Sequence, residues 1–348
     1  MAQALVGLVP WAAPGRQRKT LTVLSWHRAG MASRPLNHLR QALAAAGAAL
    51  WLAQSAQAAA AACPPALPMS STATAAQPAE RDRGFLWRAT RDGRTSYLFG
   101  TLHVGKPAWR RFGPKTAAAL RATDVLALEV DPNDPELLKA MADIRPPQPL
   151  PDELQQRLNR AFERACVASE SLAQLHPVLQ ATTLTVLEAR WLGMDPTYAL
   201  EQMLSTQARA QQKRVVSLES AVQQTQALVP DDEAEARTLL DQSLQQLEDS
   251  SGRRVLQKLS AAWEQGNLAA LEDYDHWCEC VANEADRAFM RKLNDERNPH
   301  LADGIVAQHA AGKRVFAAVG ALHMTGPQSL PLLLAQRGFK VERIDFGR

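Results

Sequence analysis

Two copies of one short motif, far apart in the chain, carry the residues best suited to chemistry. Residues 100–105 read G-T-L-H-V-G, and residues 320–326 read G-A-L-H-M-T-G. Each copy follows an apolar run and places a histidine, His103 or His323, just beyond it. Imidazole is the commonest metal ligand in proteins, and it also carries protons near neutral pH. One copy alone is usually structural, but two copies at matched positions indicate a shared site.

Two glutamates stand where similar apolar runs end. Glu129 follows V-L-A-L at residues 125–128, and Glu219 follows V-V-S-L at residues 215–218. A carboxylate at the end of a buried run is costly unless it has a partner. That partner could be a cation bound at a site. Alternatively, Glu129 could form a buried ion pair, with Arg297 for example, and Glu219 could cap the helix that follows it.

Together these four side chains predict a site for metal-dependent hydrolysis. Two neutral imidazoles and one carboxylate leave an open position on a divalent ion for water, and the ion lowers the pKa of that water. We expect His103, His323 and Glu129 to bind Mn²⁺, Co²⁺ or Zn²⁺. Glu219 would accept a proton or serve as a second carboxylate ligand.

The elements that would position these residues are strands near both ends of the chain, with helices between them. The sequence predicts helices over 114–122 and 327–336, and two long helical blocks over 152–212 and 231–294. It predicts strands over 85–90, 96–99, 124–130, 214–219, 312–320 and 340–346, the first two joined by a D-G turn. This order favours a helix-rich α/β fold with a large helical insertion between the histidine motifs. Sites in such sheets form at the carboxyl ends of the strands, where both histidines would lie.

Residues 1–58 have the features of an export signal. They hold six basic residues and no acidic one. Met31 opens a short basic stretch, the apolar stretch over 42–53 is too short to span a bilayer, and A-Q-A at 56–58 fits a cleavage site. We expect cleavage after this A-Q-A, with residues 1–30 an upstream extension from a misplaced start codon. The expected location is the periplasm or the medium, without stable membrane insertion after cleavage; an uncleaved anchor is the alternative.

The chain beyond this leader shows no charge bias toward nucleic acid. It holds 33 of the 39 Lys and Arg residues against all 36 Asp and Glu residues, so the net charge of +3 comes from the leader. Residues 59–82, rich in Ala, Pro, Ser and Thr, predict a flexible linker, and residues 83–348 a single domain. We expect no nucleic-acid partner, and a peptide or another small molecule as substrate.

Four cysteines lie beyond the leader, and their even number favours disulfides in an exported protein. They are Cys63, Cys166, Cys278 and Cys280. The C-x-C pair could instead bind a metal as thiolates, but no second pair matches it. The sequence therefore favours structural disulfides and leaves three pairings open.

Further short motifs accompany the two histidine motifs in a characteristic order. They are L-W-R at 86–88 with the D-G turn, L-E at 128–129, V-S-L-E at 216–219 followed by Gln223 and Gln224, R-N at 297–298, and L-A-Q-R-G-F-K-V at 334–341. With these motifs, residues 85–346 resemble the TraB/GumN (TraB/PrgY) family, which includes the animal TIKI proteins. The resemblance covers nearly the whole chain beyond the leader and linker.

This resemblance implies a fold akin to the erythromycin-esterase and ChaN-like proteins. TIKI members look like metal-dependent peptidases that use paired G-x-x-H histidines and a glutamate, which match His103, His323 and Glu129 here. Glu219, Arg297 and Asn298 also match family motifs and are expected to line the site. Arg297 could bind a substrate carboxylate or stabilise an oxyanion.

The resulting prediction is an exported metal-dependent hydrolase that resembles a peptidase. Two other functions remain open. One is a non-catalytic protein of the cell envelope that binds a peptide or another ligand and acts in regulation. The other is a hydrolase that needs no metal and uses histidine and glutamate as acid and base.

Overall fold

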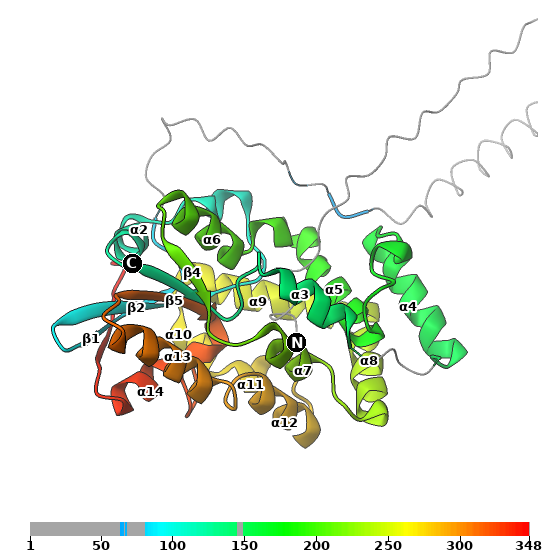
Figure 1. The fold of residues 1–348 in the computed structure, drawn as a ribbon. Helices are drawn as coiled ribbons and strands as arrows, with labels where there is room; N and C mark the ends of the chain where they lie inside the picture. The colour runs from blue at the N-terminus through cyan, green and yellow to red at the C-terminus, as the bar shows by residue number, and fades with distance from the viewer. Residues whose placement is uncertain (1–62, 66, 68–80, 145–148, 348) are drawn as a thin grey trace, which may run out of the picture. The chain divides into compact units, whose positions relative to one another are not determined.

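A six-stranded sheet with helices on both sides forms the centre of the fold in the computed structural model of this chain (Figure 1). The structure describes residues 63–65, 67, 81–144 and 149–347. The predicted export signal and nearly all of the predicted linker lie outside the described residues. No helix within the described ranges is both long enough and apolar enough to cross a membrane.

The sheet is mixed, and its four parallel strands are neighbours. The strands are β1 (Phe85–Arg91), β2 (Arg94–Thr101), β3 (Val125–Leu128), β4 (Arg214–Ser217), β5 (Val315–Gly320) and β6 (Lys340–Arg343). They lie in the order β4-β3-β5-β2-β1-β6. Strands β4, β3, β5 and β2 pair in parallel, whereas β1 pairs antiparallel with β2 and with the edge strand β6, which therefore runs in the same direction as the four. The carboxyl ends of the four parallel strands therefore meet at one edge of the sheet.

The predicted D-G turn closes the first hairpin. Asp92 and Gly93 both have positive φ, at 51° and 71°, and Arg91 pairs with Arg94 on either side of them. Glycine adopts this conformation without strain, and aspartate is among the few other residues that tolerate it. On its other side β2 pairs in parallel with β5, and Thr101 lies beside Gly320 where the two histidine motifs begin to leave the sheet.

Helices are the majority element, as the sequence predicted. Those in the predicted ranges are α2 (Pro114–Arg121), α4 (Asp152–Ala165), α5 (Pro177–Leu187), α6 (Leu200–Ala210), α8 (Glu233–Glu248), α9 (Ser251–Gln265), α10 (Leu268–Glu272), α11 (Tyr274–Trp277), α12 (Glu284–Leu293) and α14 (Leu330–Gln336). Short 3₁₀ helices join them at η1 (Pro107–Arg110), η2 (Ser169–Ser171), η3 (Glu188–Leu192), η4 (Pro196–Tyr198) and η5 (Ala321–Met324).

Within the described residues, three α-helices were not predicted, and several predicted elements are shorter than expected. The additional helices are α3 (Pro135–Ala142), α7 (Ala221–Leu228) and α13 (Asn298–Ala310). Each begins with a recognisable signal: Pro135 and Pro299 stand in the first turns of α3 and α13, and Ser220 forms a capping box with Gln223 at the start of α7. The helix predicted from residue 327 begins at 330, and the strand predicted to 346 ends at 343.

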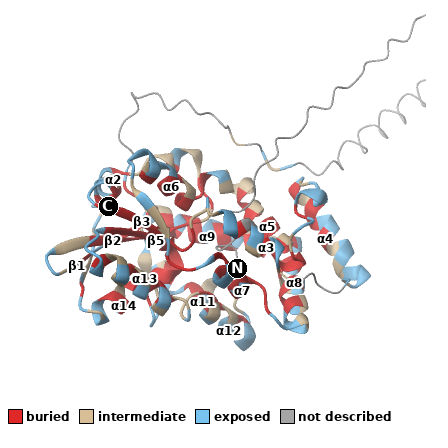
Figure 2. Cartoon of the chain, in the orientation of Figure 1, coloured by how far each residue is buried: buried red, intermediate tan, exposed pale blue. Residues whose placement is uncertain are grey.

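The helices cover both faces of the sheet and bury its central strands. In Figure 1, α2 and α6 lie on one side of the sheet, and α13 and α14 lie on the other. Every residue of β3 and β5 is buried, and both strands appear red in Figure 2. Burial on both faces explains why these strands are continuous apolar runs rather than alternating ones.

Two close contacts fix the first histidine motif. The indole Nε1 of Trp263, on α9, donates a hydrogen bond to the carbonyl oxygen of Gly100 at 2.7 Å. Gly105 pairs through its backbone with Asp195, and a Cβ added to Gly105 would lie 2.0 Å from the carbonyl oxygen of Tyr198. Glycine is therefore required at position 105 because the chain around η4 approaches it so closely.

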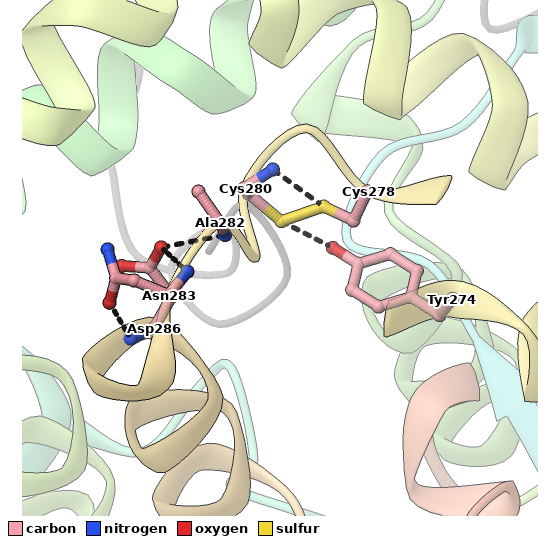
Figure 3. Close-up of a disulfide and its surroundings, with 6 residues drawn as sticks. All are labelled: Tyr274, Cys278, Cys280, Ala282, Asn283 and Asp286. Atoms are coloured by element: carbon pink, nitrogen blue, oxygen red, sulfur yellow. Dashed lines mark hydrogen bonds between the residues drawn. A yellow bond between two sulfur atoms is a disulfide. The ribbon is translucent and has the colours of Figure 1, made fainter. Parts of the chain in front are cut away.

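The described cysteines are all oxidised, as the sequence favoured. Cys278 and Cys280 form a disulfide between α11 and α12, next to the hydroxyl of Tyr274, which lies 3.3 Å from the Cys280 sulfur (Figure 3). Cys63 and Cys166 are also disulfide-bonded. With both of its sulfurs in a disulfide, the C-x-C pair is not a thiolate metal site in this structure.

Candidate active site

The strand order brings the four predicted histidines and glutamates to one edge of the sheet. Glu219 follows β4, Glu129 follows β3, His323 follows β5, and His103 follows β2. These strands are consecutive neighbours in the sheet and run parallel. The two halves of the site come from opposite ends of the sequence, because β5 inserts between β3 and β2.

Arg297 joins the two glutamates. Its Nη2 donates to Glu129 Oε2 at 2.7 Å and also to Glu219 Oε1, and its Nε donates to Glu219 Oε2 at 3.0 Å. Nη1 donates to the carbonyl oxygen of Leu293 at 2.9 Å. The two glutamate side chains are only 6% and 3% exposed. All three side-chain nitrogens of Arg297 therefore bind protein groups, and two of them bind the two carboxylates.

The second oxygen of Glu129 faces the second histidine motif. Glu129 Oε1 accepts a hydrogen bond from the backbone nitrogen of Gly320 at 2.7 Å and lies 3.7 Å from His323 Nε2. Burial by itself would raise the pKa of Glu129, but the neighbouring positive charges of His323 and Arg297 outweigh burial and hold that pKa well below its usual range. Glu129 is therefore a carboxylate at neutral pH.

Asn298 fixes which nitrogen of His323 carries a proton. The amide nitrogen of Asn298 donates to the carbonyl oxygen of Gln328 at 2.9 Å, so its oxygen Oδ1 must be the atom 2.6 Å from His323 Nδ1. An amide oxygen only accepts, so His323 donates from Nδ1. In the neutral ring Nε2 is then an unprotonated acceptor that faces the anionic oxygen of Glu129. Two acceptors repel, so this arrangement calls for a proton on Nε2 or a cation between the two atoms.

His103 is anchored in the same way, but by a charged partner. Its Nδ1 lies 3.0 Å from Glu201 Oε1, which also accepts a hydrogen bond from the Thr101 hydroxyl at 2.5 Å. Burial alone would lower the pKa of His103, but its ion pair and hydrogen bond with Glu201, together with the charge of Glu129, raise the pKa above its ordinary value. The neutral ring is again protonated on Nδ1, with Nε2 left as an acceptor.

The structure thus links five of the six predicted residues in one network of contacts. These are Glu129, Glu219, Arg297, His323 and Asn298. His103 lies at the same sheet edge but pairs with Glu201, and it reaches the network through its electrostatic interactions with Glu129 and Arg297.

Glu201 was missed by the sequence reasoning. It lies in the first turn of α6, far in sequence from His103, and follows no apolar run. Leu204, Ser205 and Ala208 on the same helix are buried beside it. An acidic residue on the apolar face of an amphipathic helix was the one signal that could have identified it.

The donor types and charges at this edge fit a divalent cation. Three carboxylates are buried here, those of Glu129, Glu201 and Glu219, and the guanidinium of Arg297 binds Glu129 and Glu219. Both imidazoles bind an acceptor through Nδ1, which is how histidine ligands of metals are usually oriented. No three His, Cys, Asp or Glu side chains in the described ranges already stand together as a metal site.

Comparison with known proteins points to one family. The model of the TraB/PrgY/gumN family matches residues 85–343. The uncharacterised protein YbaP of Shigella flexneri is 27% identical over 250 residues, which cover 69% of this chain and 88% of YbaP. YbaP of Escherichia coli strain K12 is 26% identical over the same length and coverage. No solved structure matches the chain significantly.

Proposed function

This chain belongs to the TraB/PrgY/gumN family, and from that premise we propose that it is a metal-dependent hydrolase, acting on peptides or similar small substrates. The observation that carries the proposal is that His103 and His323 have the same position relative to their strands and are bound through the same ring nitrogen. Both lie just beyond adjacent parallel strands, and both have Nδ1 bound to an acceptor, which leaves Nε2 as the nitrogen that could ligate an ion. Nε2 of His323 lies 3.7 Å from the buried carboxylate of Glu129. His103, His323 and Glu129 would hold the ion, which would be Mn²⁺, Co²⁺ or Zn²⁺.

A bound ion would polarise a substrate carbonyl and supply an activated water. The protein's own residues would prepare the site for it. Arg297 keeps Glu129 ionised and fixes its Oε2, which leaves Oε1 directed at His323. Both oxygens of Glu219 are bound to Arg297, so we assign Glu219 the role of holding that guanidinium. This contact supports the positioning role over the proton-accepting role that the sequence suggested for Glu219.

Metal content tests this proposal directly. The parent protein, His103→Ala and His323→Ala would each be stripped with chelator, loaded equally with Mn²⁺, Co²⁺ or Zn²⁺, desalted and analysed. His276→Ala is the matched control, because this histidine is 84% exposed and pairs only with Asp273. We expect about one ion per chain in the parent and the control, and loss of that ion in both site variants. A cooperatively folded parent that retains no ion would refute metal binding.

One observation favours the metal-independent alternative as a second candidate. The pairing of His103 Nδ1 with the buried carboxylate of Glu201 is the arrangement that orients a histidine as a general base through Nε2. Hydrolysis that continues undiminished in excess chelator, yet is lost in His103→Ala, would select this candidate. Loss of hydrolysis in chelator, restored by added ion, would select the metal-dependent one.

We propose in addition that the protein is exported to the periplasm or beyond. The basic and apolar segments of residues 1–58 and the oxidised cysteines support this location. Amino-terminal sequencing of the protein recovered from a periplasmic fraction should begin at Ala59. Recovery of the full-length chain from the cytoplasmic fraction would refute export.

A further inference from the structure

Glu201 has a buried carboxylate that contributes little to the stability of the fold. It lies at the start of α6 and is 9% exposed. Its Oε1 receives two donors, the Thr101 hydroxyl and His103 Nδ1, while its Oε2 has no hydrogen-bond partner among the described residues and is buried. A buried charged group with one unpaired oxygen lowers the stability of a protein. Its presence here therefore indicates a role other than stabilising the fold.

The location of α6 explains how this carboxylate reaches His103. The backbone nitrogen of Leu200 donates to the carbonyl oxygen of Leu102 at 3.1 Å, so the start of the helix is held directly against the first histidine motif. The amino terminus of a helix favours a negative charge. Thr101, at the end of β2, donates its hydroxyl to the same carboxylate oxygen that binds His103, which restricts the carboxylate further.

We infer that Glu201 is the positioning residue of His103: it binds Nδ1, so that the proton of the neutral ring stays on Nδ1 and Nε2 remains the nitrogen available to the site. The inference rests on the proposed function for the use made of Nε2, but the state of the ring can be measured without it. The two ring nitrogens point in different directions, so the carboxylate that binds Nδ1 cannot ligate an ion held by Nε2. Glu201 therefore acts through His103 and not on a substrate or an ion.

The second histidine shows what the charge of Glu201 adds. Asn298 supplies His323 with a neutral acceptor that fixes the same nitrogen. A neutral group is thus sufficient for orientation, and a carboxylate additionally increases the electron-donating strength of Nε2. Glu201 should make His103 the stronger of the two donors to a cation, and the two motifs, alike in sequence, should differ in function.

The tautomer of His103 is the primary readout, because a merely structural role would not control it. ¹⁵N-histidine NMR would be recorded for the parent, Glu201→Gln and Glu201→Ala at one fixed alkaline pH, above the raised pKa of His103, so that the ring is neutral; His103→Asn would be used to assign the signal. Glutamine retains an acceptor for His103 and Thr101 but removes the charge. We expect Nδ1 to stay protonated in the parent and in Glu201→Gln, and the ring in Glu201→Ala to become a mixture of both tautomers.

Metal affinity and stability supply the second and third readouts. We expect Glu201→Gln to weaken Co²⁺ binding about 10–100-fold, measured by the visible absorption of the bound ion, while the melting temperature stays within about 2 °C of the parent or rises. Glu188→Gln is the matched control, because Glu188 is also a buried glutamate, 5% exposed, but pairs with Arg253 away from this site. It should leave the His103 tautomer and the Co²⁺ affinity unchanged.

The results separate this inference from the proposed function. An unchanged His103 tautomer in folded Glu201→Ala would overturn the inference, whether or not the parent binds a metal. A parent that binds no Co²⁺ but loses the fixed tautomer in Glu201→Ala would refute the metal-dependent function and leave the positioning role intact. If Glu201→Ala fails to fold, Glu201→Met, which fills a similar volume without an acceptor, replaces it, and an unchanged His103 tautomer in that variant would overturn the inference.

Discussion

Replacing Arg297 with methionine should destabilise the protein strongly, and more so at neutral than at acidic pH. The change removes the cation between two carboxylates that are 6% and 3% exposed. Loss of one partner from a buried ion pair costs about 3–5 kcal/mol, because an uncompensated charge remains. In a protein of this size each kcal/mol lowers the melting temperature by about 2–4 °C, so we expect a fall of about 6–20 °C.

The pH dependence follows from the depressed pKa of Glu129. A carboxyl whose pKa is lower in the folded than in the unfolded protein contributes stability above its unfolded pKa, and this contribution is lost as pH falls through the folded pKa. Without Arg297 the pKa of Glu129 rises, so the variant can bind a proton there in the folded state. The deficit relative to the parent should therefore be greatest near about pH 8 and smaller near about pH 5.

Thermal and urea unfolding at both pH values would test this reasoning. Chelator should be present throughout, so that a lost metal ion does not add to the difference. Arg254→Met is the matched control, since it removes an arginine from an ion pair whose members are 49% and 38% exposed, and exposed pairs contribute little. Arg297→Lys, which keeps the charge but not the planar set of donors, should lie between parent and methionine variant. An Arg297→Met protein as stable as the parent near pH 8, or a deficit that does not change with pH, would refute the assignment of a buried charge network.

Three further variants test other parts of the fold and site. Gly105→Ala should cost at least about 3 kcal/mol or prevent folding, because its Cβ would lie 2.0 Å from a backbone oxygen; a normal denaturation midpoint would contradict the close approach. Replacing Cys278 and Cys280 together with serine should cost only about 1–2 kcal/mol, because residues two apart in sequence close a very short loop; loss of cooperative urea unfolding would show a larger role. Asn298→Leu should remove the acceptor that fixes the proton of His323 on Nδ1 and weaken Co²⁺ binding about 10–100-fold; an unchanged affinity would show that this amide has no role in metal binding.

Local signals in the sequence were sufficient for most of the fold. Continuous apolar runs identified β3 and β5, since strands buried on both faces need no polar side. The D-G pair identified the first hairpin, because its backbone needs positive φ. The helices α3, α7 and α13 were missed although each has a start signal. They are short or only weakly amphipathic, and α13 packs against both β5 and α14, so its apolar residues follow no single stripe.

For the candidate site, too, the sequence predicted some contacts correctly and others wrongly. The acid that ends an apolar run must have a partner, and one alternative read from the sequence, an ion pair between Glu129 and Arg297, is the contact that the structure contains. The suggestion that Glu219 caps the next helix is wrong, because Ser220 caps α7 and Glu219 binds Arg297. The sequence could not decide between these two roles for Glu219. The side chains of adjacent residues at a strand end point in different directions, and only the structure shows which of them faces Arg297.

The sequence by itself determined which residues lie at the ends of strands, because apolar runs, turn signals and strand length are local properties of the chain. It therefore located His103, Glu129, Glu219 and His323. The tertiary structure alone decided how they meet, by inserting β5 between β3 and β2. It also brought Glu201 to His103 and Asn298 to His323, and so fixed the proton on each ring. Such contacts join segments that are distant in the chain, and their geometry is set by packing rather than by spacing.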